Sequence, residues 1–549
     1  MARGTHEVRN QPPALTEYNV FRSDRALVAA LAREGASSAF ESLDRLGQLA
    51  GSGLAQEWGR LANEHPPELR THDRFGHRID EVEFHPAYHE LMSVATRNGL
   101  HAAPWVSGDP IAHTARAAKF YVWGQVEAGH GCPISMTYAA IPALRTTAAL
   151  ARVWEPRLAQ CDYDPLLRPI SEKRSAICGM AMTEKQGGSD VRANLTRAVF
   201  AERTDAGDAY LITGHKWFCS APMSDMFLVL AQTDAGLTCF LMPRVLPDGS
   251  RNHISIQRLK DKLGNRSNAS SEIEMEDAWA LLVGEPGRGV QTIVEMVNGT
   301  RLDCINGSAA LMRQAVAQAI HHTTYRHAFG SALIDQPLMQ NVLADIALES
   351  EAAMTLLVRL ARAVDRGESE IKRLGTAVGK YFVCKRTPVV VAEALECLGG
   401  NGYVEESPMP RLYREAPLNS IWEGSGNINA LDVLRIISKQ PQALDAFLAE
   451  VEPALDDARM RTAAGALTKA LREEQNAQSR ARTIVERMAL LWQAALLARD
   501  PDNPSAEVFI DSRIGGEWGH TLGTLAPSQA LEVVIERAQP AQNVEYSER

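Results

Sequence analysis

The stretch AVFAERTDAGDAYLI, residues 198–212, decides the fold class of this chain. Two apolar runs flank an acidic, glycine-containing turn at residues 204–208, which predicts a β-hairpin. Residues 227–242 repeat this arrangement around a second turn, and the alternation of apolar and polar residues continues within residues 255–275. Residues 179–283 are therefore predicted to form an all-β unit.

Helical periodicity lies on both sides of this unit. On the N-terminal side, apolar residues recur every third position after Phe40, so residues 36–178 are predicted to form a helical domain. On the C-terminal side, residues 339–364 carry apolar and small residues at near-heptad spacing, which is typical of a helical bundle. A second long helix, with a kink at Pro388, is expected at residues 376–398.

The two ends of the chain complete the predicted organisation. Residues 1–35 form an N-terminal arm, residues 284–440 a four-helix bundle, and residues 441–549 an extra C-terminal helical domain. The fold class is therefore α+β multidomain, with the β unit between helical domains. The motif at residues 399–402, GGNG, follows a helix and lacks the GxGxxG spacing, which argues against a Rossmann fold.

Charge, apolar runs and cysteine usage narrow the functional classes that the sequence favours. The 549 residues carry a net charge of −10, which favours neither nucleic acid nor an anionic membrane. Residues 1–20 show no signal peptide, and the apolar run 488–498 is far shorter than a bilayer span. The eight cysteines form no CxxC pair, so we expect reduced thiols and a cytoplasmic location. We expect no metal site, because the adjacent His321 and His322 cannot face one metal from a helix.

The stretch LNSIWEGSGN, residues 418–427, holds one carboxylate, that of Glu423, between a tryptophan and a flexible turn. Apolar surroundings raise the pKa of a carboxyl group and suit it to proton abstraction. The Gly-Ser-Gly turn lets the backbone approach a phosphate or a ring closely. Taken alone, these ten residues favour a solvated loop glutamate.

Five segments taken together favour a different interpretation. The segments are MTEKQGGSDV (182–191), GHKWFCS (214–220), RHAFG (326–330), LGGNGY (398–403) and IWEGS (421–425). In their order and spacing they resemble the acyl-CoA dehydrogenase superfamily of flavoproteins, over about residues 100–437. Residues 10–13, residues 62–69 and the extra C-terminal helices resemble the AidB branch, which is associated with the adaptive response to DNA alkylation.

The resemblance implies a homotetramer that binds FAD without a covalent bond, between the β domain and the C-terminal helices. It assigns flavin-ring contacts to Met182, Thr183, Phe218 and Ser220, with Ser220 donating to flavin N5. It places Ser189 where relatives meet the CoA phosphates. Phe218 and Ser220 replace a common tryptophan and threonine but keep a flat apolar face and a hydroxyl.

The remaining contacts implied by the resemblance involve the far end of the FAD. Arg326 and Phe329 match residues that reach the pyrophosphate and adenine of another subunit's FAD, where a fixed arginine suits a phosphate. The backbone at Gly399, Gly400 and Gly402 would approach the same FAD. Ser425 and Asn427 would bind near the adenosine end.

The implied reaction is α,β-dehydrogenation of an acyl-CoA, with Glu423 at the position of the catalytic base. The α-proton is very weakly acidic, so the thioester carbonyl has to be polarised as the proton leaves. In the isovaleryl-CoA branch the base comes from a helix position that is Thr300 here, and threonine cannot take that role. Nitroalkane oxidases carry aspartate at the position of Glu423, which argues against their reaction.

A second hypothesis concerns binding rather than chemistry. The AidB resemblance implies that double-stranded DNA binds through the C-terminal helical domain. Residues 441–549, however, carry 11 basic and 17 acidic residues, and DNA-binding domains usually have a basic excess. Within residues 459–487 basic and acidic residues alternate, which favours a salt-bridged, solvated helix. The alternative function is a metabolic acyl-CoA dehydrogenase without DNA binding.

Overall fold

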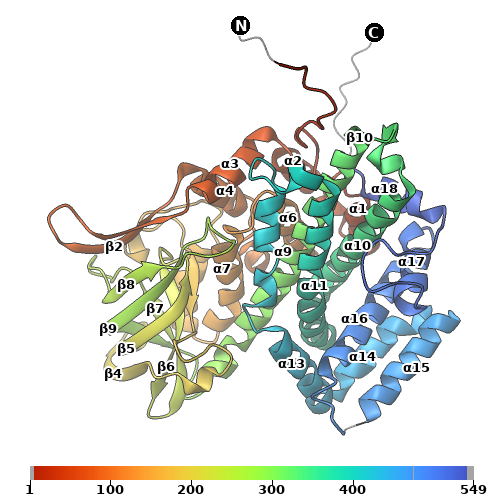
Figure 1. Cartoon of the computed structure of the whole chain (residues 1–549). Helices are drawn as coiled ribbons and strands as arrows, with labels where there is room; N and C mark the ends of the chain where they lie inside the picture. Colours follow the sequence, from red (N-terminus) through yellow and green to blue (C-terminus); the bar gives the residue numbers. More distant parts are fainter. Residues whose placement is uncertain (1–4, 474, 541–549) are drawn as a thin grey trace. The chain divides into compact units, whose positions relative to one another are not determined.

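A computed structural model describes residues 5–473 and 475–540 (Figure 1). The chain divides into two compact units. The sheet unit comprises residues 57–120 and 127–303, and the helical unit comprises residues 1–56, 121–126 and 304–549. Three helices contribute residues to both units: α3 (Gly53–Glu64), α6 (Ala112–Gly124) and α9 (Gly289–Tyr325).

In the described part of the sheet unit, seven strands form one sheet in the order β3-β6-β4-β5-β9-β7. Strand β7 pairs back onto β6 and closes the sheet, and β8 adds to β9. The strands are β3 (Cys178–Ala181), β4 (Arg197–Thr204), β5 (Gly207–Ser220), β6 (Met226–Thr233), β7 (Gly236–Pro243), β8 (Ile254–Leu259) and β9 (Ser270–Val283). The hairpin predicted from residues 198–212 is confirmed, with Phe200 of β4 opposite Tyr210 of β5.

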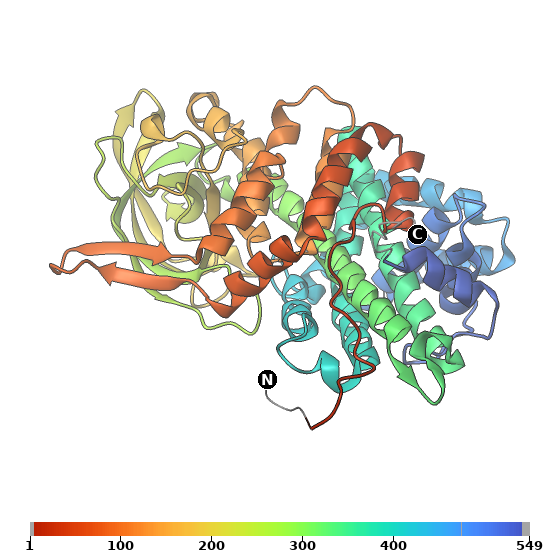
Figure 2. The same cartoon turned by 90° about the horizontal axis from the view of Figure 1, so that it is seen from above.

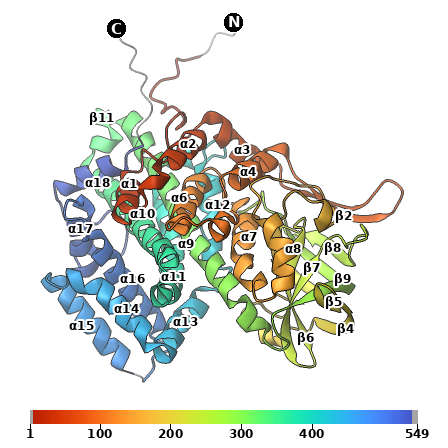
Figure 3. The ribbon, with the colours of Figure 1, turned by 180° about the vertical axis from the view of Figure 1, so that it is seen from behind.

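Strand β6 is buried on both faces of the sheet. Leu228 and Leu230 pack with Ile141 of helix α7, whereas Phe227 and Val229 belong to a second core on the other face. A strand buried on both faces carries a continuous apolar run, as β6 does. Figure 3 shows helices α7 and α8 beside the strands. The helices wholly within this unit are α4 (Pro86–Arg97), α5 (Ala103–Val106), α7 (Gly131–Leu144) and α8 (Ala148–Leu158).

A β-hairpin lies within the segment where the sequence predicts only helices. Strands β1 (Glu68–His72) and β2 (Arg78–Glu83) pair antiparallel and project from the rest of the sheet unit (Figures 1 and 2). Strand β1 has no buried residue, and β2 buries one charged and one apolar residue, Asp80 and Val82, so neither strand shows the apolar alternation that identifies a half-buried strand. Val82 packs into the second core of the sheet.

The helical unit is built around two 29-residue helices that pack against each other, α10 (Pro337–Asp365) and α11 (Ser369–Cys397). Residues 343–361 of α10 are buried throughout, as expected for a helix inside a bundle. The other elements are α1 (Arg25–Arg33), α2 (Phe40–Ala50), β10 (His327–Ala328), β11 (Ser331–Ala332), α12 (Met409–Glu415), α13 (Gly426–Lys439), α14 (Pro441–Val451), α15 (Ala458–Arg472), α16 (Ala481–Leu497), α17 (Pro504–Phe509) and α18 (Ala530–Ala538), with short 3-10 turns at residues 37–39, 333–335, 399–402, 418–420 and 452–454 and a π-helical turn at residues 510–514.

The extra C-terminal helices are joined to the bundle by a buried ionic cluster. Arg513 has a fully buried side chain that pairs with Asp345 and Glu349 of α10. Arg386 of α11 pairs with the same Glu349, and Trp518 donates its indole N–H to Asp345. Buried charges are tolerated only when they are paired and hydrogen-bonded, so this cluster fixes how residues 510–518 dock on α10.

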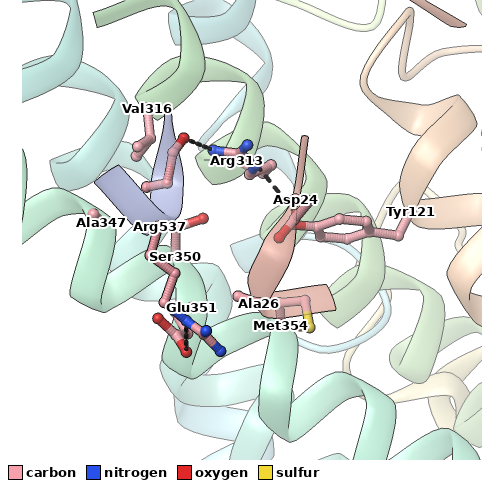
Figure 4. A pocket seen from close by; sticks show the side chains of 11 residues that line it. Asp24, Ala26, Tyr121, Arg313, Val316, Ala347, Ser350, Glu351, Met354 and Arg537 are labelled. Carbon is pink, nitrogen blue, oxygen red and sulfur yellow. Dashed lines mark hydrogen bonds and ion pairs between the residues drawn. The ribbon is translucent and has the colours of Figure 1, made fainter. Parts of the chain in front are cut away.

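A smaller polar cluster joins the N-terminal and C-terminal segments of the helical unit (Figure 4). Arg313 of α9 lies 3.2 Å from the Asp24 carboxylate, which also accepts a hydrogen bond from Tyr121. Arg313 donates to the Ala538 carbonyl, and Arg537 pairs with Glu351. The enclosed space of about 20 Å³ fits one water molecule, and its charges are paired, so the cluster is structural.

Candidate active site

Glu423 lies in a tight loop between the 3-10 turn at residues 418–420 and helix α13. Its backbone has φ +57°, in the left-handed region, and Gly424 follows with φ +96°. A non-glycine residue held there costs on the order of 1–3 kcal/mol and persists only where its surroundings impose it. The loop therefore has to be held by contacts elsewhere in the helical unit.

The contacts that hold this loop come from Lys380 and Asn429. Lys380 is a buried residue of α11, and its Nζ donates to the carbonyls of Trp422 and Gly424, both at 2.8 Å. Asn429 of α13 donates its side-chain amide to Gly424 at 2.6 Å and to Ser425 at 3.1 Å. The carbonyls on both sides of Glu423 are thus fixed. We call this set of bonds the Lys380 clamp.

In the sheet unit, the loop of residues 182–196 is organised by a buried ion pair. The Thr183 carbonyl accepts a hydrogen bond from the Trp217 N–H of β5. Next to it, the Glu184 carboxylate pairs with Lys216 Nζ at 2.8 Å, and both side chains are fully buried. Glu184 also accepts the backbone N–H of Leu195 at 2.7 Å and that of Thr196. One carboxylate therefore fixes both ends of the loop.

The other predicted flavin contacts of the sheet unit lie beside this loop or at the end of β5. Phe218 and Ser220 share one face of β5, because side chains alternate along a strand and Cys219 between them is buried. Phe218 is 51% exposed, and the Ser220 hydroxyl lies 3.1 Å from that of Ser270. Met182 is half-buried and its carbonyl is bound by Asn194, whereas Ser189 is exposed on the loop.

Arg326 and Phe329 lie where α9 ends and the small β10–β11 hairpin begins. Phe329 has φ +56° and is 99% exposed, an unusual combination for a large apolar residue. The N-terminal arm contacts this segment, because Arg326 donates to the Asn10 carbonyl and the Asn10 side chain bonds both backbone groups of His327. Figure 2 shows the arm, in dark red, running beside helix α9.

The glycines at residues 399–402 lie near the same arm. Asn401 donates its side-chain amide to Gln11. A Cβ atom at Gly402 would lie 2.5 Å from the Leu395 carbonyl, so packing requires glycine there. At Gly400, by contrast, a Cβ atom would meet nothing within 4 Å and no positive φ is present. Packing therefore gives no reason for glycine at position 400.

Ser425 and Asn427 flank the start of α13 in the helical unit. The Ser425 carbonyl accepts the first helical N–H, that of Asn429, and Asn427 is exposed. The Asn427 amide oxygen accepts a hydrogen bond from Arg482 of α16 at 2.9 Å. Sequence reasoning did not assign a role to Arg482, Lys380, Asn429 or Asn10. The stretch 376–398 contains two lysines, Lys380 and Lys385, and the first of them, which lies among apolar residues, was a signal that could have pointed to the clamp.

Three further features of the described residues concern metal ligands, membrane spans and cysteines. Residues 5–473 and 475–540 contain no group of three or more His, Cys, Asp or Glu side chains that could hold a metal ion. No helix in these ranges has the length and apolar character needed to cross a bilayer. All eight cysteines are free. Thr300, at the alternative base position, is buried and its hydroxyl donates to the Val297 carbonyl.

Three segments of the chain match known domain families. Residues 10–165 match the adaptive response protein AidB N-terminal domain, residues 179–278 the acyl-CoA dehydrogenase middle domain, and residues 287–438 the acyl-CoA dehydrogenase C-terminal domain. The chain is 48% identical to AidB of Escherichia coli K12 over 526 residues, which cover 93% of this chain and 95% of that protein. It is 31% identical to acyl-CoA dehydrogenase family member 11 of Caenorhabditis elegans, over 76% of this chain and 70% of that protein.

Solved structures agree with these matches. The C. elegans protein ACDH-11 in complex with C11-CoA superposes with a TM-score of 0.82, at 27% identity, over 98% of this chain and 94% of that one. An acyl-CoA dehydrogenase of Bacillus anthracis complexed with FAD has the same fold, with a TM-score of 0.65 at 20% identity, over 82% of this chain and 89% of that one. The protein is an oxidoreductase of the acyl-CoA dehydrogenase class. Within that class, the chain belongs to the AidB branch of the family.

Proposed function

We propose that this protein binds FAD, catalyses at least weak α,β-dehydrogenation of an acyl-CoA, and protects DNA against alkylation damage by binding it. The observation that supports the enzymatic part best is the Lys380 clamp, which holds Glu423 in a strained conformation. Strain of this kind gathers at functional sites. The complex of ACDH-11 with C11-CoA makes an acyl-CoA the first substrate class to test.

The residues proposed to hold FAD fit that group chemically. Phe218 offers an exposed flat ring, Ser220 a hydroxyl, and Gly400 an open backbone position that packing does not explain. Met182 and Thr183 would contact the flavin ring and Ser189 the CoA phosphates. Arg326, Phe329, Gly399, Gly402, Ser425 and Asn427 would contact the pyrophosphate and adenosine parts. A bound FAD would supply an acceptor for the hydride from the substrate's β-carbon.

Glu423 has two roles in this proposal. Its carboxylate removes the α-proton, and its backbone N–H donates to the thioester carbonyl, whose developing negative charge is thereby stabilised. The Lys380 clamp fixes this peptide, so the donor is in place before the substrate arrives. Preorganised donors are effective because no reorganisation is needed during the reaction.

We propose that the protein is a homotetramer in which Arg326 and Phe329 serve a neighbouring subunit's FAD. The support is the near-complete exposure of Phe329 on a strained turn, with Leu338 82% exposed and Tyr403 80% exposed in the same unit. A large apolar side chain that is almost fully exposed on a strained turn is available for contact with a neighbouring subunit. Sedimentation of the flavin-loaded protein tests this, and a monomer at micromolar concentration would contradict it.

Fewer observations support DNA binding than support the enzymatic activity. Arg459 is bound by Asp457, Glu507 and Asp511, and Arg480 pairs with Glu473, which confirms the expectation of salt-bridged helices. Lys469, Arg472 and Arg487 are exposed and form no ion pair within the described residues. These three cations of α15 and α16 are the proposed phosphate contacts.

The test is a titration of the flavin-loaded protein with labelled duplex DNA at two salt concentrations. We expect binding that weakens with salt, and the double charge reversal Lys469→Glu and Arg472→Glu is expected to reduce it further. Arg203→Glu, an exposed position in the sheet unit, is the control. Absence of binding at low salt, together with fast reduction of the flavin by acyl-CoA, would favour the alternative of a metabolic acyl-CoA dehydrogenase.

Lys380→Met is expected to reduce kcat for flavin reduction by about 10- to 100-fold. The substitution removes two hydrogen bonds from a charged donor, each worth roughly 1.5–3 kcal/mol, so the loop can relax out of its left-handed conformation. Stopped-flow absorbance of the bound flavin measures the rate. The exposed Lys439→Met is the matched control. An unchanged kcat in folded, flavin-loaded Lys380→Met would show that the clamp does not position Glu423.

A further inference from the structure

The sheet unit contains a cavity to which the proposed chemistry assigns no role. It is bounded by strand β2, helix α4, the loop at residues 163–168 and the turn at residues 221–225 between β5 and β6. Its volume is about 320 Å³. Small-molecule sites begin at about this size, which exceeds what a few trapped waters fill.

One wall of the cavity is aromatic. The rings of Phe84 and Tyr88 stack with centroids 4.3 Å apart, and the His89 ring meets Phe84 edge-on. Tyr163 extends the wall, with its hydroxyl 3.1 Å from His89 Nδ1. Burial lowers the pKa of the His89 imidazole, so the wall is uncharged at neutral pH. Stacked and edge-on rings of this kind suit a flat aromatic guest.

The cavity also has an acceptor-rich polar side at Ser224 and Asp225. The Ser224 hydroxyl belongs to a residue that is 2% exposed, and it has no hydrogen-bond partner within the described residues. Leaving a buried hydroxyl unpaired is costly, so an unmade bond of this kind calls for a missing partner. Asp225 follows it directly and is also buried.

The charge of Asp225 is only partly used by its neighbours. One carboxylate oxygen lies 3.0 Å from Lys173 Nζ, and the other accepts the Ile177 N–H at 2.8 Å. A carboxylate oxygen can accept two hydrogen bonds, so each retains capacity for one more. The ammonium of Lys173 also donates to the carbonyls of Asp164 and Leu166, which leaves no spare cation inside the cavity. A guest therefore has to bring N–H donors and no interior negative charge.

The rim of the cavity, unlike its interior, carries a positive charge that no ion pair among the described residues neutralises. Arg251 is paired with Glu81, but Arg168 is exposed and has no ion pair within the described residues. An anionic tail on the guest would meet this arginine outside the cavity.

We propose that this cavity binds a flat heteroaromatic molecule of nucleobase size that carries N–H donors. The ring lies against the aromatic wall, its N–H groups donate to Asp225, and the Ser224 hydroxyl donates to a ring nitrogen. The molecule is either a free base or nucleoside, or a nucleotide whose phosphate contacts Arg168. All of these molecules have the nucleobase in common.

The test uses adenine, adenosine and adenosine monophosphate, titrated into the full-length, flavin-loaded protein by calorimetry and ligand-observed NMR. Ser224→Ala is expected to weaken the binding of adenine about three- to tenfold, the effect of one hydrogen bond, without lowering the melting temperature, because the hydroxyl has no partner to lose. The exposed Ser479→Ala is the matched control and is expected to change neither quantity.

The source of the base is decided by Arg168→Ala. Weaker binding of the monophosphate alone, relative to the wild type, assigns the cavity to a nucleotide. Wild-type affinities of Arg168→Ala for all three probes assign it to a base or nucleoside. The proposal is overturned if none of the three probes shows saturable binding. It is also overturned if binding is unchanged in Ser224→Ala, since the probe would then occupy another place.

Discussion

Glu423→Gln is expected to slow the reduction of bound flavin by acyl-CoA between about 10²- and 10⁴-fold, the usual contribution of a positioned general base. Glutamine keeps the size and the hydrogen-bonding character of the side chain but cannot accept the α-proton. The Lys380 clamp acts through the backbone carbonyls of Trp422 and Gly424, so the loop is expected to keep its shape. Flavin content and melting temperature should therefore match those of the wild type.

The control for this prediction is Glu405→Gln, an exposed glutamate that pairs with Arg414 in the same unit. Its rate is expected to equal that of the wild type. Because Thr300 cannot act as a base, no second carboxylate is available at the alternative helix position. A folded, flavin-loaded Glu423→Gln protein with wild-type rates would remove Glu423 from the catalytic role.

Glu184→Gln is expected to destabilise the sheet unit by about 3–5 kcal/mol, the cost of leaving one member of a buried ion pair without its partner. Glu184 and Lys216 are both fully buried, and in the variant the Lys216 ammonium has only neutral acceptors, the Leu230 carbonyl and the glutamine amide oxygen. The same substitution weakens the bonds from Leu195 and Thr196, so the loop of residues 182–196 should become mobile and lose flavin affinity. Calorimetric unfolding and flavin retention measure the two effects.

Two further variants show whether the unpaired charge of Lys216 causes the loss of stability. Adding Lys216→Met to Glu184→Gln removes the unpaired charge, so part of the lost stability should return. Asp208→Asn removes an exposed partner of Arg203 and is expected to change stability by less than about 0.5 kcal/mol. Equal stability of Glu184→Gln and the wild type would mean that the pair does not organise the loop.

The same carboxylate predicts part of the acid sensitivity of the protein. Burial raises the pKa of Glu184, but the hydrogen bonds from Lys216 and the backbone outweigh it and lower the pKa to about 2. A lowered pKa means that the carboxylate contributes stability above its ordinary value of 4.5, and that this contribution is lost as the pH falls from there towards 2. Between about pH 5 and pH 3, Glu184→Gln should therefore lose less stability than the wild type. Identical slopes would contradict this assignment.

The order of the domains could be predicted because strands and helices each leave a short-range periodic pattern of apolar residues in the sequence. Residues 198–212 alternate around a turn, and residues 343–361 form one buried helical stretch, so hairpin and bundle both follow from short-range patterns. The hairpin β1–β2 was not predicted, because β1 has no buried residue and the two buried residues of β2 are Asp80 and Val82, so the strands carry no apolar alternation. The extra C-terminal helices could be foreseen, but not their anchoring through Arg513.

The candidate site was less accessible to sequence reasoning. Glu423 could be singled out by its neighbours, whereas its left-handed backbone and its dependence on Lys380 join residues 43 positions apart in the chain. The pairing of Glu184 with Lys216 likewise joins a loop residue to strand β5, 32 positions further along the chain. Contacts between distant segments leave no periodic trace, so the groups that hold a site are harder to find than the groups that perform its chemistry.

The most direct test of the account is an anaerobic titration of the purified, flavin-loaded protein with a panel of acyl-CoAs of different chain lengths, followed by the absorbance of the flavin. We predict that at least one acyl-CoA bleaches the flavin and is converted to the α,β-unsaturated thioester. A protein that retains its flavin and its fold, and that no member of the panel bleaches, would contradict the assignment of acyl-CoA dehydrogenation to this chain.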